Sequence, residues 1–450
     1  MQRADAAVRN AFVKPAGKGK RIGLFASLVL LHLALCMGKS FALAETAAAH
    51  FGTALLFTVP FAIMLAFFFH VQSGASLTDL LLGGGICVAA MLLRLSFADR
   101  YTGDYEYYLE GWLKRFAGQS FPASMRMQVG EYHVLYQYIL YLATRLPFAW
   151  LYLVKAVSFV GDAFLAGAAL QVLRISGRPC RDARGLVVLL LPAIALNGGM
   201  FAQCDSLYTA ALAWGLLWIL DAKPGQGMAC MGLAICLKLQ AVFLFPLLPL
   251  LYLGGKIRLK DVIPFFLTIL LIQLPAIFGG KNPADLVGIY LNQTGLYTEL
   301  NYGCPNLWAL LVSAGLDGYA YGTFGIALAA GSCLLLASAL LHRRVEPKAV
   351  DWVGMAALLV LLVTFFLPRM HERYTYPAEI LTWLYALCDR RAIPAAAAIS
   401  LADFFALWTA AVPLWGCAVL MLFGILTLLM LLFPGMNPGN TGNSGTGDAR

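Results

Sequence analysis

The sequence predicts an all-α, polytopic integral membrane protein. Of its 450 residues, 61% are hydrophobic and only 12% are charged. Apolar stretches of about 20 residues, the length of a membrane-spanning helix, recur along the chain. These runs are continuous rather than alternating, and backbone groups in lipid must be paired within the protein, so helices are predicted instead of a barrel. We expect roughly 11 to 13 transmembrane helices.

The charge distribution predicts an orientation in the membrane. The net charge is +9, and residues 1–21 are basic and polar. Because Lys and Arg are enriched in cytoplasmic loops, we place this segment in the cytoplasm and expect no nucleic-acid partner. The apolar run from Ile22 has no convincing small-residue cleavage site after Lys39, so we interpret it as an uncleaved span. The ten cysteines include no CxxC pair and predict neither a zinc site nor a disulfide scaffold.

The predicted organisation has five parts. Two N-terminal spans within 22–79 precede a core over 80–390, which contains a large outer loop at 99–147. Further spans occupy 391–434, and a Gly/Asn-rich tail at 435–450 is predicted to be disordered and cytoplasmic. The individual spans are expected at 22–44, 50–70, 80–98, 148–173, 185–200, 206–221, 261–279, 320–341, 351–367, 377–388, 392–412 and 414–434.

Residues 226–253 are interpreted as a hairpin of two short helices that meet near Lys238. This arrangement keeps the basic loop at 256–260, and every later basic loop, on the cytoplasmic side.

Most unusual polar residues fall on the opposite, outer face in this topology. They are Asp104, Glu131, His133, Asp205, Lys238, Gln240, Asn306 and residues 369–374. A conduction path would place ionisable groups at several depths, so this segregation indicates one polar site at the outer leaflet. Lys155 and Asp162 are exceptions, because they lie seven residues apart on one face of a predicted span and are either structural or pathway groups.

The segment 364–376, TFFLPRMHERYTY, has the densest group of ionisable residues between two apolar runs. One interpretation is an ordinary charged loop between two membrane helices. The other is an anion site, since the guanidiniums of Arg369 and Arg373 and the imidazole of His371 can bind a phosphate while Glu372 orients one of them.

The outer loop is predicted to contain helices that lie on the membrane surface. In 101–117, aromatic and aliphatic side chains recur with helical spacing while Glu106, Glu110 and Lys114 take the other face. Residues 134–146 are expected to form either a second interfacial helix or the approach to the span at 148–173. Asp104 begins the first helix, where it either caps the N-terminus or serves as a general base toward a sugar hydroxyl, and the two roles are compatible.

Several segments together resemble a known superfamily. They are GEYHVLYQYIL at 130–140, KAVSFVGD at 155–162, FAQCDSLY at 201–208, LKLQAVFLFPL at 237–247, PNLW at 305–308 and FLPRMHERY at 366–374. In this order they resemble motifs of the GT-C superfamily of membrane glycosyltransferases, over roughly 95–390. The chain is most similar to bacterial relatives of the GPI-anchor second mannosyltransferase and, more distantly, to dolichyl-phosphate-glucose glucosyltransferases. It departs from the usual pattern at Glu131, where Asp is common, and at Leu239, where Pro is common.

The resemblance implies an inverting glycosyltransferase in a bacterial plasma membrane, with its active site facing outward. Such an enzyme moves a hexose of mannose or glucose type from a polyprenyl-phosphate donor to a glycan, glycolipid or protein acceptor, with no metal or other cofactor. Asp104 would be the base. Lys238, His371 and Arg373 would face the donor phosphate. The residues expected to orient these groups or bind sugar are Asp205, Gln240, Glu372, Glu131, His133 and Tyr374.

Two other functions remain open. A transporter or flippase of lipid-linked sugars would be expected to distribute charges through its spans or to contain an internal repeat, and no clear repeat is present in the sequence. An O-antigen-type ligase or polymerase would use lipid diphosphates, and Asp104 would then have no obvious role.

Overall fold

The computed structural model describes residues 15–177, 183–292, 298–316, 321–342, 346–408 and 411–434. The predicted tail 435–450 and most of the predicted basic tail 1–21 lie outside these residues. The chain divides into two compact units, Met1–Glu299 and Leu300–Arg450, so the predicted core 80–390 is split at residue 299.

The predicted fold class is confirmed. In the described part of the chain, nine helices are long and apolar enough to cross a membrane, and strands are nearly absent, so the protein is an all-α polytopic membrane protein. The nine are Lys18–Gly38, Ala47–Val71, Leu77–Leu95, Trp150–Ile175, Leu259–Phe278, Gly322–Leu341, Ala349–Phe366, Arg390–Trp408 and Leu414–Leu432. Shorter apolar helices occupy the positions of other predicted spans.

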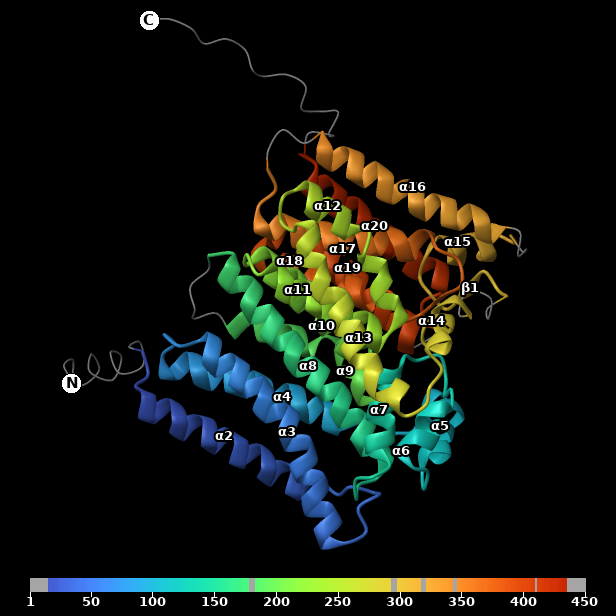
Figure 1. Cartoon of the computed structure of the whole chain (residues 1–450). Coiled ribbons are helices and arrows are strands. Elements are labelled where there is room, and N and C mark those ends of the chain that lie inside the picture. The colour runs from blue at the N-terminus through green and yellow to red at the C-terminus, as the bar shows by residue number, and fades with distance from the viewer. Residues whose placement is uncertain are drawn as a thin grey trace, which may run out of the picture. The chain divides into compact units, whose positions relative to one another are not determined.

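The N-terminal part of unit 1 is a group of four long helices (Figure 1). They are α2 (Lys18–Gly38), α3 (Ala47–Val71), α4 (Leu77–Leu95) and α8 (Trp150–Ile175). The first of these helices already begins at Lys18, within the segment predicted as a tail. Side-chain caps set two of the starts: Thr46 accepts from the N–H of Ala49, and Ser76 forms a reciprocal capping box with Asp79. α3 packs against α2, α4 and α8 and contributes a row of buried phenylalanines.

The outer loop folds into four short helices. They are the π-helix η1 (Tyr105–Leu109), α5 (Glu110–Phe116), α6 (Phe121–Arg126) and α7 (Val134–Ala143). The predicted helix at 101–117 is therefore present, but its first turn is a wider π turn. Tyr105 and Leu109 are buried as expected, whereas Tyr108 is 57% exposed. Each residue of a π turn rotates by a smaller angle about the helix axis than a residue of an α turn. This smaller rotation places the Tyr108 side chain away from the buried face.

The predicted span 185–200 is wrong as a single helix. The structure has a 3-10 helix, η2 (Ala183–Leu190), followed by α9 (Pro192–Gly199). Pro192 has no N–H to continue a helix from the preceding turn, and it begins α9 in the first position, where that N–H is not needed.

The remainder of unit 1 contains the interrupted segment around Lys238. Its elements are α10 (Asp205–Leu220), α11 (Pro224–Leu237), η3 (Leu239–Leu244), α12 (Leu247–Leu253), η4 (Leu259–Val262), α13 (Ile263–Phe278) and α14 (Pro283–Asn292). Lys238 itself is extended, with φ −155° and ψ 138°. The helical break that the hairpin interpretation requires is therefore present at this residue.

Unit 2 consists of helices and one pair of very short strands. Its elements are β1 (Asn301–Tyr302), α15 (Leu307–Ser313), α16 (Gly322–Leu341), α17 (Ala349–Phe366), β2 (Met370–His371), α18 (Tyr376–Cys388), η7 (Arg390–Ala392), α19 (Ile393–Trp408) and α20 (Leu414–Leu432). β1 and β2 pair in parallel, with Tyr302 opposite His371. This pairing fixes the segment after α17, which carries the predicted anion site.

Candidate functional site

Asp104 lies at the start of η1, and its carboxylate interacts with a distant segment of the chain. In the described residues around it, its side chain makes no capping hydrogen bond to the helix that follows. Its Oδ2 instead accepts a hydrogen bond of 2.7 Å from Nε2 of Gln203. Asp104 therefore does not cap this helix with its side chain, although the sequence allowed that role.

Gln203 reaches Asp104 because the chain turns sharply between α9 and α10. Ala202 has φ 54°, a left-handed conformation that is uncommon outside glycine. The Gln203 N–H donates to the carbonyl of Asn197 (2.9 Å), which closes this turn. The same turn leads directly to Asp205, the first residue of α10. One short connection therefore carries both the partner of Asp104 and the second carboxylate of the site.

Asp205 and Lys238 form a buried ion pair. The Lys238 ammonium donates to Oδ1 of Asp205, and Nδ2 of Asn197 donates to Oδ2 over 2.9 Å. Asp205 is fully buried and Lys238 is 7% exposed, so the ammonium does not extend to an aqueous interface. This is the contact expected if Asp205 holds Lys238. Charges buried this deeply need such pairing, because an isolated ion in the interior is strongly disfavoured.

Aromatic rings surround the Lys238 ammonium. Its Nζ lies 6.0 Å from the ring centre of Tyr132 and 5.8 Å from that of Tyr208, within the range of cation–π attraction. Tyr132 in turn packs against Tyr136, with ring centres 4.4 Å apart, and against Trp112 of α5, at 5.7 Å. The Lys238 ammonium is thus held by Asp205 and Tyr208 of α10 and by Tyr132 of the outer loop.

The remaining predicted residues of unit 1 occupy different environments. Glu131 is exposed in the turn before Tyr132, and Gln240 is buried in η3, two residues after Lys238. His133 is buried at the start of α7, where its ring stacks on Tyr290 (5.6 Å) and its Nε2 lies 3.1 Å from Nε2 of Gln273. These contacts connect His133 to α13 and α14.

The predicted anion loop in unit 2 is held by its own set of contacts. The His371 ring stacks on Tyr302 at 5.1 Å and lies 5.1 Å from the ring of Tyr374. The Glu372 carboxylate accepts a hydrogen bond from Arg373 (3.2 Å) and lies 3.9 Å from Nδ1 of His371. Glu372 therefore sits between the two cationic candidates, which is the orienting position proposed for it from the sequence.

A buried polar network lies directly after this loop. Thr375 donates to Oδ1 of Asp403 (2.5 Å), and Ser400 donates to Oε1 of Glu379 (2.5 Å). Both carboxyl groups are buried, Glu379 in α18 and Asp403 in α19. Thr375 immediately follows Tyr374, so the network fastens the end of the loop to α18 and α19.

The structure brings together some of the predicted residues in each unit. In unit 1, Asp205 contacts Lys238, and Asp104 is bonded to Gln203, two residues before Asp205, whereas Glu131, His133 and Gln240 have other surroundings. In unit 2, the contacts join His371, Glu372, Arg373 and Tyr374. Gln203, Asn197 and Tyr132 were not singled out from the sequence, although Gln203 and Tyr132 lie inside the quoted motifs. Over the described ranges, no three His, Cys, Asp or Glu side chains come together as a metal site.

Comparisons with models of known protein families and with curated proteins found no match for this chain.

Proposed function

We propose that the protein is an inverting glycosyltransferase of GT-C type that uses a sugar carried on a polyprenyl monophosphate. The observation that supports this most directly is the environment of Asp104. Its carboxylate accepts a hydrogen bond from Gln203, which precedes Asp205 of the Asp205–Lys238 ion pair by two residues, and it makes no capping hydrogen bond to the following helix. The ordered motifs described from the sequence supply the reaction class.

In the proposed reaction, Asp104 accepts the proton of an acceptor hydroxyl as its oxygen attacks the anomeric carbon. The bond from that carbon to the phosphate oxygen breaks, the configuration inverts, and the lipid phosphate leaves as a monoester. The Gln203 amide donates to Oδ2 of Asp104, which orients the carboxylate for its role as a general base.

The leaving phosphate gains negative charge, so a fixed cation stabilises the transition state more than the ground state. Lys238 is a candidate in unit 1, and His371 and Arg373 are candidates in unit 2. The pairing of Arg373 with Glu372 orients a guanidinium that carries five N–H donors.

The first experiment compares Asp104→Asn with Glu106→Gln in purified protein in nanodiscs. Glu106 is an exposed carboxylate two residues away, which makes it a matched control. With synthetic polyprenyl-monophosphate sugars supplied one at a time, we expect Asp104→Asn to lose at least about 100-fold in transfer rate. Donor-dependent thermal stabilisation should remain, and Glu106→Gln should resemble the wild type. Retained activity in Asp104→Asn would contradict the assignment of the base.

A second comparison separates the enzyme from the alternatives. Arg373→Ala should weaken the thermal stabilisation given by the monophosphate donor, because a charge-assisted contact to phosphate is lost. If lipid diphosphate sugars stabilise the wild type and monophosphates do not, the proposal is overturned in favour of a ligase or flippase.

A further inference from the structure

The segment between α4 and Asp104 is anchored by the buried ammonium of Lys155. Its Nζ donates to the carbonyl oxygens of Phe97 (2.7 Å), Ala98 (3.1 Å) and Arg100 (2.7 Å). An ammonium has three N–H donors, so all of them are directed at this one stretch of backbone. Lys155 therefore fixes the chain up to four residues before Asp104.

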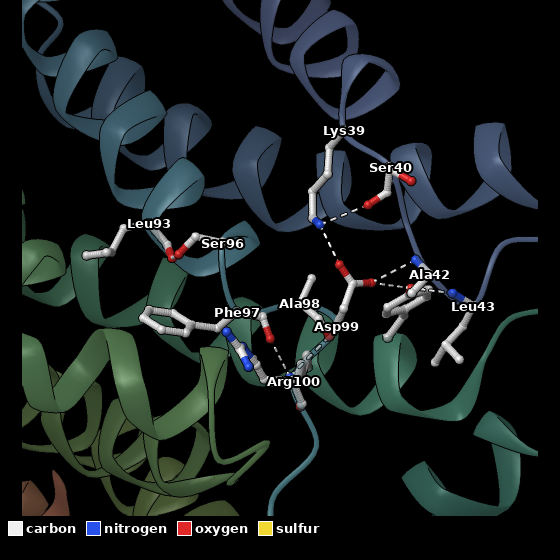
Figure 2. A network of polar contacts seen from close by, with 12 residues as sticks. Lys39, Ser40, Ala42, Leu43, Leu93, Ser96, Phe97, Ala98, Asp99 and Arg100 are labelled. Atoms are coloured by element: carbon white, nitrogen blue, oxygen red, sulfur yellow. Dashed lines mark hydrogen bonds and ion pairs between the residues drawn. The ribbon is translucent and has the colours of Figure 1, made fainter.

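The same stretch is anchored on its other side by the connection between α2 and α3 (Figure 2). The Asp99 carboxylate accepts hydrogen bonds from Lys39 Nζ (2.5 Å), Tyr152 Oη (2.5 Å) and the N–H of Ala42 (3.0 Å), and Tyr152 Oη also accepts from the N–H of Leu43 (2.9 Å). Burial opposes ionisation of Asp99, but these hydrogen bonds outweigh it and hold the pKa of the carboxyl below its ordinary value.

One face of α8 supports both segments that carry the candidate site. Lys155, Ser158 and Asp162 follow each other at helical spacing. Ser158 Oγ donates to the carbonyl of Gln203 (2.6 Å), the residue that holds Asp104. A Cβ at Gly161 would lie 2.7 Å from the backbone N of Leu207, so this glycine permits α8 to approach the start of α10 closely. α8 thus fixes Asp104 and its hydrogen-bond partner relative to one another.

We propose that Lys39, Asp99 and Lys155 are positioning residues for Asp104, and that the 39–43 connection of the two N-terminal spans belongs to the reaction apparatus. This inference rests on the proposed function. The two spans that precede the resembling core are then not accessory. Lys39 acts through Asp99, and Lys155 holds the backbone on either side of Asp99. The segment that these residues fix leads directly to Asp104.

The test compares Lys39→Met and Lys39→Arg with Lys223→Met as a matched control. Lys223 also pairs with an aspartate (Asp221, 2.6 Å), but on an exposed surface of unit 1. Misplacement of a catalytic group by about 1 Å can cost on the order of 100-fold in rate. We expect kcat of Lys39→Met to fall about 10- to 100-fold while KM for a polyprenyl-monophosphate sugar stays within about twofold. Lys39→Arg should restore most of the rate.

Amide hydrogen exchange provides a second readout that does not depend on activity. In Lys39→Met, exchange should increase in residues 96–108 while α8 stays protected, because the loss is confined to one anchor. Lys223→Met should leave this segment unchanged. Unchanged exchange at 96–108, or equal changes in kcat for both methionine variants, would overturn the positioning role. If the wild type has no transferase activity but Lys39→Met still shows the expected increase in exchange, only the proposed function is contradicted.

Discussion

His133 is a buried imidazole whose surroundings favour its neutral form. Burial, with a smaller contribution from the positive charge of Lys281, lowers its pKa from 6.5 to about 4, although a hydrogen bond to the backbone of Cys236 works in the opposite direction. Its Nε2 lies 3.1 Å from the side-chain amide of Gln273.

This environment predicts an acid-sensitive contribution of His133 to stability. Because its pKa is lower in the folded protein than in the unfolded chain, the unfolded state binds the proton more readily. The contribution is fully present above pH 6.5 and is lost as the pH falls through about 4, by about 3 kcal/mol in total. Thermal unfolding measured between pH 7 and pH 4 should show a smaller loss for His133→Gln than for the wild type.

The control for this experiment is His342→Gln, a substitution at an exposed histidine. Its profile should follow that of the wild type. If His133→Gln loses stability with pH as steeply as the wild type does, His133 is not the group responsible.

At the scale of elements, α8 holds α4 through a second buried contact. Arg94 Nε donates to Oδ2 of Asp162 over 2.6 Å, both side chains are fully buried, and Arg94 also donates to the carbonyl of Leu189. Asp162 is therefore a structural group, as one of the two interpretations of the sequence proposed.

Breaking this pair from one side should destabilise the protein strongly. Asp162→Asn leaves the Arg94 guanidinium buried without its counter-charge, and such losses typically cost about 3–5 kcal/mol. Denaturation in detergent micelles should reveal this loss. The double variant Arg94→Met with Asp162→Leu should recover much of it, because no unpaired charge remains. Equal destabilisation of the single and double variants would show that shape, and not charge, dominates at this position.

Most elements could be predicted because their signals are local. Apolar runs of the required length marked the long spans, and the interruption at Lys238 followed from the charge pattern of the flanking loops. The helix expected at 185–200 failed because Pro192 divides an otherwise continuous apolar run. The π turn at Tyr105–Leu109 was not visible, since the same hydrophobic spacing fits an α-helix nearly as well.

At the scale of the whole molecule, the charge pattern predicts the sidedness of exposed positions. Tyr107 is 82% exposed on the helix that follows Asp104, and Lys260 is exposed in η4, at the end of the basic segment 256–260. In a cysteine-free background in intact cells, Tyr107→Cys should react with a membrane-impermeant maleimide. Lys260→Cys should react only after permeabilisation, because basic loops stay in the cytoplasm. The reverse pattern would contradict an outward-facing site.

The membrane class, the helical fold, most span positions and the residue types at the candidate site could all be predicted from the amino-acid sequence. These properties depend on composition and on neighbours within one or two helical turns. Only the tertiary structure decided the partners: Gln203 meets Asp104 across 99 residues, and Lys238 meets Asp205 across 33. It also showed that Lys155 holds the backbone at 97–100 and that Asp162 pairs with Arg94 of α4. Such pairings depend on how helices pack against one another. The sequence around either residue does not indicate which distant residue it will contact.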